Sequence, residues 1–338
     1  MHFNIPLGLV DYGLILLFFP IFVLRFVHWT FDRYILRNKV ASNHVDSFEK
    51  EFSQYISSLE VRPGRSLTVL HIPRCNDGSS KGLMIFVHGA CARMQQFVNQ
   101  IRYFMKEGYE IVSYDALGCG SSSKPIGQSH YVSDEMYRDF VAIIELFTRQ
   151  KNSPAVSIVG HSFGGAMVTK LAISPESTSL TRTAVSLCQP VDTGVSRQSG
   201  SVFRLPVSVL WLIRPLLGIK ARELLLGPHA TEDLRQQEKE ASARNPVHMF
   251  KSFYTGITPG FFKLSSFNGM PQVPLLLVAG DSDKICPSDG VRALEDHLKC
   301  SRLRFTIASE CGHQCMQEDP SQINRLIVKF LEEMASKE

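Results

Sequence analysis

Residues Ala155–Gly165 of this chain read Ala-Val-Ser-Ile-Val-Gly-His-Ser-Phe-Gly-Gly, and they are the most informative residues about the fold. A mostly apolar run ends in a Gly-x-Ser-x-Gly pattern centred on Ser162, and a helix is expected to begin at Phe163. A sharp strand-to-helix turn strains the backbone at its serine, and glycines flank it because side chains there would collide with neighbouring backbone. The Gly-x-Ser-x-Gly motif by itself is common. Between a buried strand and a helix, it predicts that Ser162 is a nucleophile.

Predicted strands and helices alternate on both sides of this stretch. The strands are continuous apolar runs, which is typical of parallel strands covered on both faces. The alternation predicts an α/β fold with a mostly parallel twisted sheet and helices on both faces. A hairpin across Pro63-Gly64, formed by Ile56–Val61 and Ser66–Ile72, precedes it. The other expected strands are Leu83–Val87, Glu110–Tyr114, Ala155–Val159, Thr183–Leu187, Val273–Ala279 and Leu303–Ile307, and the expected helices include Arg93–Lys106, Asp134–Arg149, Pro287–Leu298 and Pro320–Met334.

The alternation stops between roughly Val191 and Leu264. This insertion holds an apolar run, Leu205–Ile219, and a charged helix, Thr231–Ala243, followed by the aromatic residues Phe250, Phe253, Tyr254, Phe261 and Phe262. Such a composition predicts a helical lid over an apolar pocket. The alternative is that these side chains form only the insertion's own core.

The N-terminal residues differ from the rest of the chain. Ile5–Leu24 is almost wholly apolar, with Asp11 and Pro20 as interruptions, and about 20 apolar residues can span a bilayer. The basic residues follow, at Arg25, Arg33, Arg37 and Lys39, which places the rest of the chain on the cytoplasmic side. We expect a membrane-anchor helix with a basic flank in residues 1–40 and an α/β domain in residues 41–338, with the lid at about 191–264. An interfacial helix and a cleaved signal are the alternatives, and the endoplasmic reticulum is one membrane that fits.

The composition excludes several classes of protein. The chain has 338 residues with a formal net charge of +4 and no basic stripe, which disfavours a nucleic-acid partner. Its eight cysteines are too few for a dense disulfide framework. Cys311-Gly312-His313-Gln314-Cys315 places three soft ligands at alternate positions, unlike the paired spacing of zinc sites. We therefore expect neither a metal nor a cofactor.

A serine nucleophile needs a histidine base, and the histidine needs an orienting carboxylate. In folds of this type the chain order is serine, acid, histidine. Asp281 and Asp283 both follow the predicted strand Val273–Ala279, and His313 follows the last predicted strand. These positions lie at the carboxyl ends of strands, where α/β sheets bind ligands. His313 is the expected base, and either aspartate could orient it.

Negative charge on the carbonyl oxygen requires backbone N–H donors. One is expected from Phe163, the residue after the nucleophile. The other is expected from the loop after the strand Leu83–Val87, and we assign it to Ala90.

Five segments carry a family resemblance when they are taken together. They are His88-Gly89, Tyr114–Ser122, the turn around Ser162, Gly280–Pro287, and Gly312-His313 with Glu318 and Pro320. The set resembles the AB-hydrolase superfamily, and within it the abhydrolase-domain (ABHD) group of membrane-associated serine hydrolases. The insertion is loosely similar to that of the ABHD subgroup numbered eight. The Gly-x-x-Asp-x-x-x-Pro form of the fourth segment favours Asp283 over Asp281.

The resemblance implies hydrolysis of a carboxylic ester through an acyl-enzyme, with Ser162, Asp283 and His313 as the triad. Epoxide hydrolases and dehalogenases of the superfamily use aspartate as the nucleophile, and epoxide hydrolases place two lid tyrosines where this insertion has only Tyr254. Some relatives carry a His-x-x-x-x-Asp pattern associated with acyl transfer, and here Glu318 stands at that spacing. A lipid-like ester is the expected substrate. A lipid acyltransferase and a non-catalytic scaffold remain the alternatives.

Overall fold

The computed structural model describes Val23 and residues 47–74, 81–148, 156–194, 199–258 and 260–337. Apart from Val23, the predicted anchor in residues 1–40 lies outside the described residues. Among the residues that are described, no helix is both long enough and apolar enough to cross a membrane.

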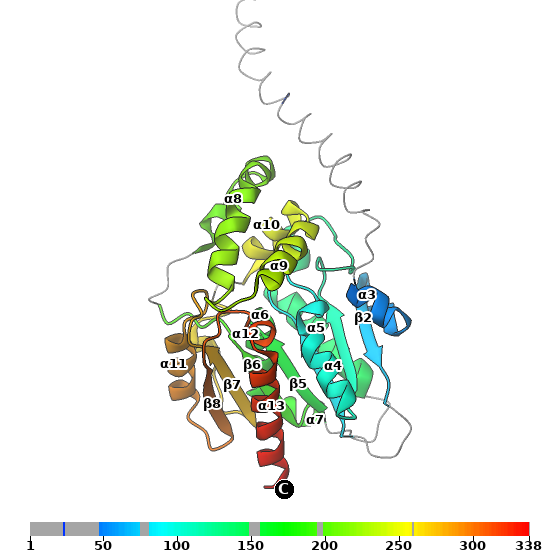
Figure 1. Ribbon diagram of the computed structural model, residues 1–338, viewed down its shortest axis with the longest axis vertical. Coiled ribbons are helices and arrows are strands. Elements are labelled where there is room, and N and C mark those ends of the chain that lie inside the picture. The colour runs from blue at the N-terminus through cyan, green and yellow to red at the C-terminus, as the bar shows by residue number, and fades with distance from the viewer. Residues whose placement is uncertain are drawn as a thin grey trace, which may run out of the picture. The chain divides into compact units, whose positions relative to one another are not determined.

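The described residues form one eight-stranded sheet in the order β1-β2-β4-β3-β5-β6-β7-β8 (Figure 1). β1 and β2 form the predicted antiparallel hairpin, and β2 also pairs antiparallel with β4. All the remaining pairs are parallel, so the predicted mostly parallel sheet is confirmed. The strands are β1 Ile56–Arg62, β2 Arg65–Ile72, β3 Leu83–Val87, β4 Glu110–Asp115, β5 Val156–His161, β6 Thr183–Leu187, β7 Leu275–Gly280 and β8 Leu303–Ala308.

Apolar cores cover both faces of the sheet. In β3, Leu83, Ile85 and Val87 belong to one buried cluster, whereas Met84 and Phe86 belong to the other. This is why the strands are continuous apolar runs: successive side chains point to opposite faces, and both faces are buried. The first cluster includes residues of α5 Ser133–Thr148, α6 Phe163–Ala172 and α11 Ser288–Leu298, and the second includes residues of α3 Ser47–Phe52, α4 Val98–Lys106 and α13 Pro320–Ala335.

Most predicted elements begin and end within two residues of their observed bounds. The exception is the helix predicted for Arg93–Lys106, where a 3-10 turn, Met94–Phe97, precedes α4. The side chain of Asp115 accepts a hydrogen bond from the N–H of Met94 at 2.8 Å, which ties this turn to the end of β4. Two short helices outside the predicted lid were not predicted, α7 Ser177–Leu180 and α12 Cys315–Glu318. Within the lid, the helix α10 Val247–Gly256 was not predicted individually.

Among the described residues between β6 and β7, three α-helices lie at the carboxyl ends of the parallel strands (Figure 1). They are α8 Val207–Leu225, α9 Glu232–Arg244 and α10 Val247–Gly256. The two ends of the segment that contains these helices lie side by side, because Asp192 and Lys263 form a parallel β-bridge. We call these helices and their connections, between Asp192 and Lys263, the cap.

Candidate active site

Ser162 lies in the turn between β5 and α6 with φ 52° and ψ −116°, a backbone conformation that is strained for a non-glycine residue. A Cβ added at Gly160 would collide with the carbonyl of Gly164, and one added at Gly164 would collide with the carbonyl of Val87. The N–H of Ser162 donates to the carbonyl of Leu187 at 2.8 Å. The two glycines are therefore needed to bring α6 close to the sheet, and the turn directs Ser162 to the sheet's carboxyl edge.

The structure brings Ser162, His313 and Asp283 together in one chain of hydrogen bonds. Ser162 Oγ is 3.0 Å from His313 Nε2, and His313 Nδ1 is 2.8 Å from Asp283 Oδ2. All three residues are buried. The other carboxylate oxygen of Asp283 accepts the N–H groups of Ile285 and Cys286, each at 2.8 Å. These bonds hold the carboxylate in the orientation that the imidazole requires.

Asp281, the alternative acid, has a different partner. Its carboxylate accepts the N–H of Glu310 at 2.9 Å, which joins the loop after β7 to the loop after β8. The structure therefore brings Asp283, and not Asp281, to His313.

The two expected oxyanion donors lie on adjoining segments. Phe163 is the first residue of α6, and N–H groups in the first turn of a helix have no intrahelical acceptor. Ala90 follows Gly89, which lies against the serine: a Cβ at Gly89 would be 3.2 Å from that of Ser162. The parallel pairing of β3 with β5 produces this proximity, because Val87 stands opposite Gly160.

The side chain of His88 braces the Ala90 loop. Its Nδ1 is 2.7 Å from the carbonyl of Gly89, and its Nε2 accepts the N–H of Ala116 at 2.9 Å. Burial lowers the pKa of His88, so the ring is neutral, with its proton on Nδ1.

Gln96 connects the Ala90 loop to the His313 loop, and sequence reasoning did not identify it. Its Oε1 accepts the N–H of Gly89 at 3.0 Å, and its Nε2 donates to the side-chain oxygen of Gln314 at 2.7 Å. Gln96 and Gln314 are 218 positions apart and both are buried. No local pattern in the sequence marks such a pair.

Glu318 holds the backbone on each side of His313. Its Oε2 accepts the N–H of Gly312 at 3.0 Å, and its Oε1 accepts the N–H of Gln314 at 3.2 Å. Oε2 also accepts the N–H of Gly227, a cap residue, at 2.9 Å. The sequence singled out Glu318 only through the family resemblance, and its contacts are those of a side chain that positions the histidine and joins its loop to the cap.

Two further titratable groups lie beside His313. His161 Nε2 is 2.8 Å from the carbonyl of His313, and the two ring centroids are 4.7 Å apart. Burial lowers the pKa of His161 well below its ordinary value, so no fixed positive charge stands next to His313. Glu238, on α9, accepts a long hydrogen bond of 3.4 Å from Gln314, and burial raises the pKa of Glu238 to about 7.

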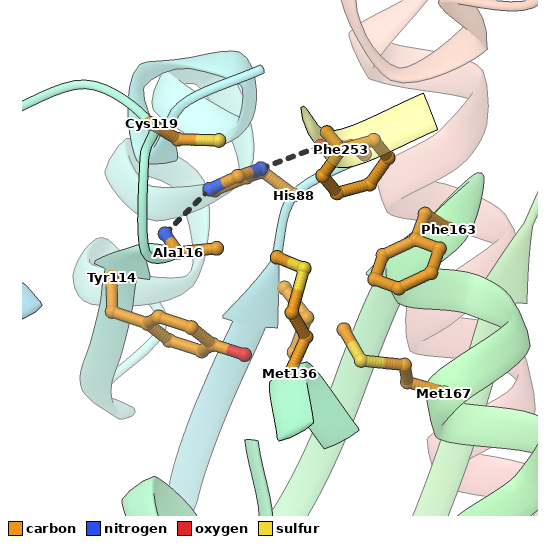
Figure 2. A pocket seen from close by; sticks show the side chains of 10 residues that line it. His88, Tyr114, Ala116, Cys119, Met136, Phe163, Met167 and Phe253 are labelled. Carbon is orange, nitrogen blue, oxygen red and sulfur yellow. Dashed lines mark hydrogen bonds between the residues drawn. The ribbon is translucent and has the colours of Figure 1, made fainter. Parts of the chain in front are cut away.

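A small pocket adjoins the serine turn (Figure 2). The aromatic rings of the cap close one side: Phe253 of α10 packs against Phe163 with ring centroids 5.2 Å apart, and Phe261 stacks on Phe163 at 5.5 Å. In Figure 2 the hydroxyl of Tyr114 is directed into a largely apolar environment. The lining residues are Val87, His88, Gly89, Tyr114, Ala116, Cys119, Met136, Phe163, Met167 and Phe253.

One group of potential metal ligands lies at the site within the described part of the chain. The ligand atoms of Asp283, Cys286 and His313 lie within 4.8 Å of one another. Asp283 and His313 are already hydrogen-bonded to each other, and burial raises the pKa of the Cys286 thiol well above its ordinary value. A protonated thiol is a poor ligand, so the group suits a hydrogen-bonded pair better than a metal. Cys315 contacts the thiol of Cys188 at 3.5 Å.

The strand order, the strained serine between a parallel strand and a helix, and the cap inserted after β6 are those of an α/β hydrolase. The model of a hydrolase family described as serine aminopeptidase, S33, matches residues 78–320, and the chain belongs to this family.

Among curated proteins the chain is similar to Protein ABHD8 of Homo sapiens, which is 26% identical over 277 residues. The matched region is 80% of this chain and 60% of that protein, so the chain spans about three fifths of the length of this relative.

Solved structures share the fold. An esterase (EaEST) from Exiguobacterium antarcticum has a TM-score of 0.67 at 18% identity, over 82% of this chain and 99% of its own. The epoxide hydrolase VrEH1 from Vigna radiata has a TM-score of 0.64 at 16% identity, over 83% of this chain and 99% of its own.

Proposed function

We propose that this hydrolase cleaves carboxylic esters through an acyl-enzyme, with Ser162 as nucleophile, His313 as general base and Asp283 as orienting acid. The observation that carries the proposal is the continuous hydrogen-bond chain from Ser162 Oγ through the His313 ring to the Asp283 carboxylate, at 3.0 and 2.8 Å. These are the distances at which a base can take the serine proton and an acid can fix the histidine tautomer.

In this mechanism Ser162 attacks the ester carbonyl while His313 Nε2 takes its proton. Asp283 stabilises the imidazolium, and the N–H groups of Phe163 and Ala90 stabilise the oxyanion. The imidazolium then protonates the departing alcohol, and a water activated by the same histidine releases the acid. A positioned general base contributes about 10²–10⁴-fold in rate, and one oxyanion donor contributes about 10²–10³-fold.

The proposed substrate is a lipid-like ester, such as an acylglycerol or lysophospholipid. The apolar lining of the pocket beside Phe163 supports this, because Met136, Met167 and Phe253 offer dispersion contacts to an acyl chain and few polar partners. We assign the cap the role of a lid, since its aromatic residues pack on Phe163, directly beside the proposed nucleophile.

We also propose that the chain is attached to a membrane through its N-terminal residues. Residues 1–40 anchor the protein to a membrane, and residues 41–338 form the hydrolase domain on the cytoplasmic side, at the endoplasmic reticulum among other membranes that fit. The apolar run Ile5–Leu24 and the basic residues after it support this arrangement.

A fluorophosphonate probe on the purified full chain tests the nucleophile. We expect one adduct, located on Ser162 by mass spectrometry, and its loss in Ser162→Ala with an unchanged melting temperature. Ser179→Ala, at an exposed serine, is the matched control and should label like the natural chain. Folded natural protein that takes up no label would refute the proposal and favour a non-catalytic scaffold.

Product analysis tests the substrate class and the direction of acyl transfer. Monoacylglycerols, lysophospholipids and short soluble esters are compared, with and without a lysolipid acceptor. We expect free fatty acid as the main product and a preference for long acyl chains. Preference for short soluble esters contradicts the lipid assignment, and transfer of the acyl group to the lysolipid identifies an acyltransferase.

A further inference from the structure

The helix α8 carries a row of exposed apolar side chains. Val209, Leu212, Leu216 and Ile219 are spaced by three, four and three residues, which places them on one helix face. Leu212 and Leu216 are 72% and 69% exposed. Leu210 points away from this row and is buried. The row is thus the outer surface of an amphipathic helix whose apolar side faces away from the body.

This concentration of apolar surface is unusual within the described residues. Of their thirteen exposed large hydrophobic side chains, seven lie between positions 205 and 224. In Figure 1, α8 stands beyond α9 and α10, away from the sheet. A contiguous apolar patch of this kind marks an interaction surface, because water-exposed apolar area is unfavourable unless something covers it.

The charges around the row are mostly positive. Arg204 precedes α8, and Lys220 and Arg222 lie in its last turns, while Glu223 is the single acidic residue of the helix. Trp211, which is 40% exposed, lies at the border of the row. Apolar side chains flanked by cations, with a tryptophan at the border, are typical of helices that lie in the plane of an anionic membrane surface.

The same helix does not suit a transmembrane orientation. Its 19 residues include Arg214, Lys220, Arg222 and Glu223, and Pro215 lies inside it. Arg214 is turned inward and donates to the carbonyl of Asn245 at 3.0 Å. A helix with one apolar face and one face packed on the cap binds in the plane of the bilayer.

The end of α8 is joined to the proposed catalytic histidine loop. The N–H of Gln314 donates to the carbonyl of Leu225, the last residue of α8, at 3.2 Å. Two residues further on, the N–H of Gly227 shares the Glu318 carboxylate with Gly312. A surface that binds α8 is therefore connected, through a few hydrogen bonds, to the backbone on both sides of His313.

We propose that the exposed face of α8 is a membrane-docking surface that lies in the plane of an anionic phospholipid bilayer, with Leu212 and Leu216 inserted among the acyl chains and Lys220 and Arg222 at the headgroups. Its purpose rests on the proposed function, because docking brings the cap and the serine turn to a lipid-like ester. The docking itself is a physical property that is measured without turnover.

The chain contains two tryptophans, Trp29 and Trp211, which gives a site-specific readout. In full-length Trp29→Phe, the remaining fluorescence comes from Trp211. We expect dibrominated phospholipid chains to quench it in mixed phosphatidylcholine and phosphatidylserine vesicles, less so in phosphatidylcholine alone, and less so at high salt. Undiminished emission in brominated mixed vesicles would overturn the proposal.

Matched variants in the same background locate the contact. Leu212→Glu with Leu216→Glu should abolish the quenching. Met270→Glu, at a 63% exposed methionine that precedes β7 at the opposite end of the strands, should leave it intact. Lys220→Glu with Arg222→Glu should make the quenching of Trp211 independent of phosphatidylserine. This variant tests the contact even if the leucine variant does not fold. Equal quenching in the leucine variant and in Met270→Glu rejects the α8 contact.

Light scattering separates docking on lipid from self-association. We expect the Leu212→Glu, Leu216→Glu variant and the parent chain to have the same mass without vesicles. A parent dimer that becomes a monomer in this variant, together with absent quenching, would assign the surface to a second copy of the chain. Fluorophosphonate labelling of Ser162 in the same variants tells a failure of docking apart from a failure of the proposed chemistry.

Discussion

The helices α6 and α8 flank the same site and differ in almost every physical respect. In α6, nine of ten residues are buried, and Lys170 is the exception. In α8, one of nineteen is buried, Leu210. α6 packs on the sheet and holds Ser162 in a strained conformation that only a rigid surrounding can maintain. α8 packs on α9 and α10 along one face, and its other face presents apolar side chains to the solvent.

Catalysis and lipid contact are thus assigned to elements of different rigidity in this hydrolase. The groups proposed to do chemistry lie on elements with buried contacts on all sides, where a displacement is costly. The side chains proposed to meet the lipid lie on the outer face of α8, which a bilayer can cover without breaking a contact that the described residues make. Substitutions on the buried side and on the exposed side should therefore have very different effects.

Substitution of Asp283 and of Asp281 tests which aspartate orients the catalytic histidine. Asp283→Asn should lower kcat by about 10⁴-fold, because an amide favours the wrong tautomer of His313. Asp281→Asn should lower kcat by less than about threefold, since its carboxylate meets a backbone N–H and not the histidine. Steady-state ester hydrolysis measures both. Similar losses in the two variants would mean that the site is not ordered as described.

Truncation of one leucine in each helix tests the contrast directly. Leu171→Ala, in α6 at 1% exposure, should reduce the free energy of unfolding by about 2–5 kcal/mol, through lost burial and a cavity. Leu212→Ala, in α8 at 72% exposure, should change it by less than about 0.5 kcal/mol. Denaturant unfolding followed by circular dichroism gives both values. A large cost for Leu212→Ala would show that the α8 face is already covered within the chain.

Substitution of Gln96 tests whether a side chain outside the proposed triad positions the loops that carry Ala90 and His313. Gln96→Ala should lower kcat by about tenfold with little change in KM, because the Ala90 loop and the His313 loop lose their common support.

Gln100→Ala is the matched control for that substitution. Its side chain is also buried, but it donates to Met316 and Asn324 and not to the Ala90 loop. Loss of stability in both variants, with kcat lowered only in Gln96→Ala, supports a positioning role. An equal loss of kcat in both variants is the contrary result.

Glu238 tests the contact between α9 and the His313 loop. Burial raises the pKa of Glu238 from 4.5 to about 7, so between these values the folded chain binds the proton more tightly than the unfolded chain. The contribution of Glu238 to the free energy of unfolding therefore falls as the pH rises from about 4.5 to about 7. Above about pH 7 the full cost of burying the charged carboxylate is present. Glu238→Gln should remove the penalty, so its melting temperature should fall less than that of the natural chain between about pH 5 and about pH 8. Parallel melting profiles in the two proteins would contradict the raised pKa.

Local patterns in the sequence determined much of this protein. Continuous apolar runs predicted the parallel strands. Both faces of the sheet are buried, so each strand is apolar at successive positions, and this is visible in its own sequence. The glycines around Ser162 predicted the strained turn, since the collisions that exclude side chains there arise from the turn's own geometry and the strand beside it. The order of Ser162, Asp283 and His313 followed from strand ends that meet at one edge, with the preference over Asp281 taken from the family resemblance.

Contacts between residues that are far apart in the sequence became visible only in the folded chain. Gln96 reaches Gln314, and Glu318 gathers N–H groups from both sides of His313 and from the cap. A buried backbone N–H can be satisfied by any nearby oxygen, so neither residue type nor spacing reveals which side chain will supply it. The same holds for α8: its apolar run was visible in the sequence, but whether that run faces a core or the solvent depends on what packs against it.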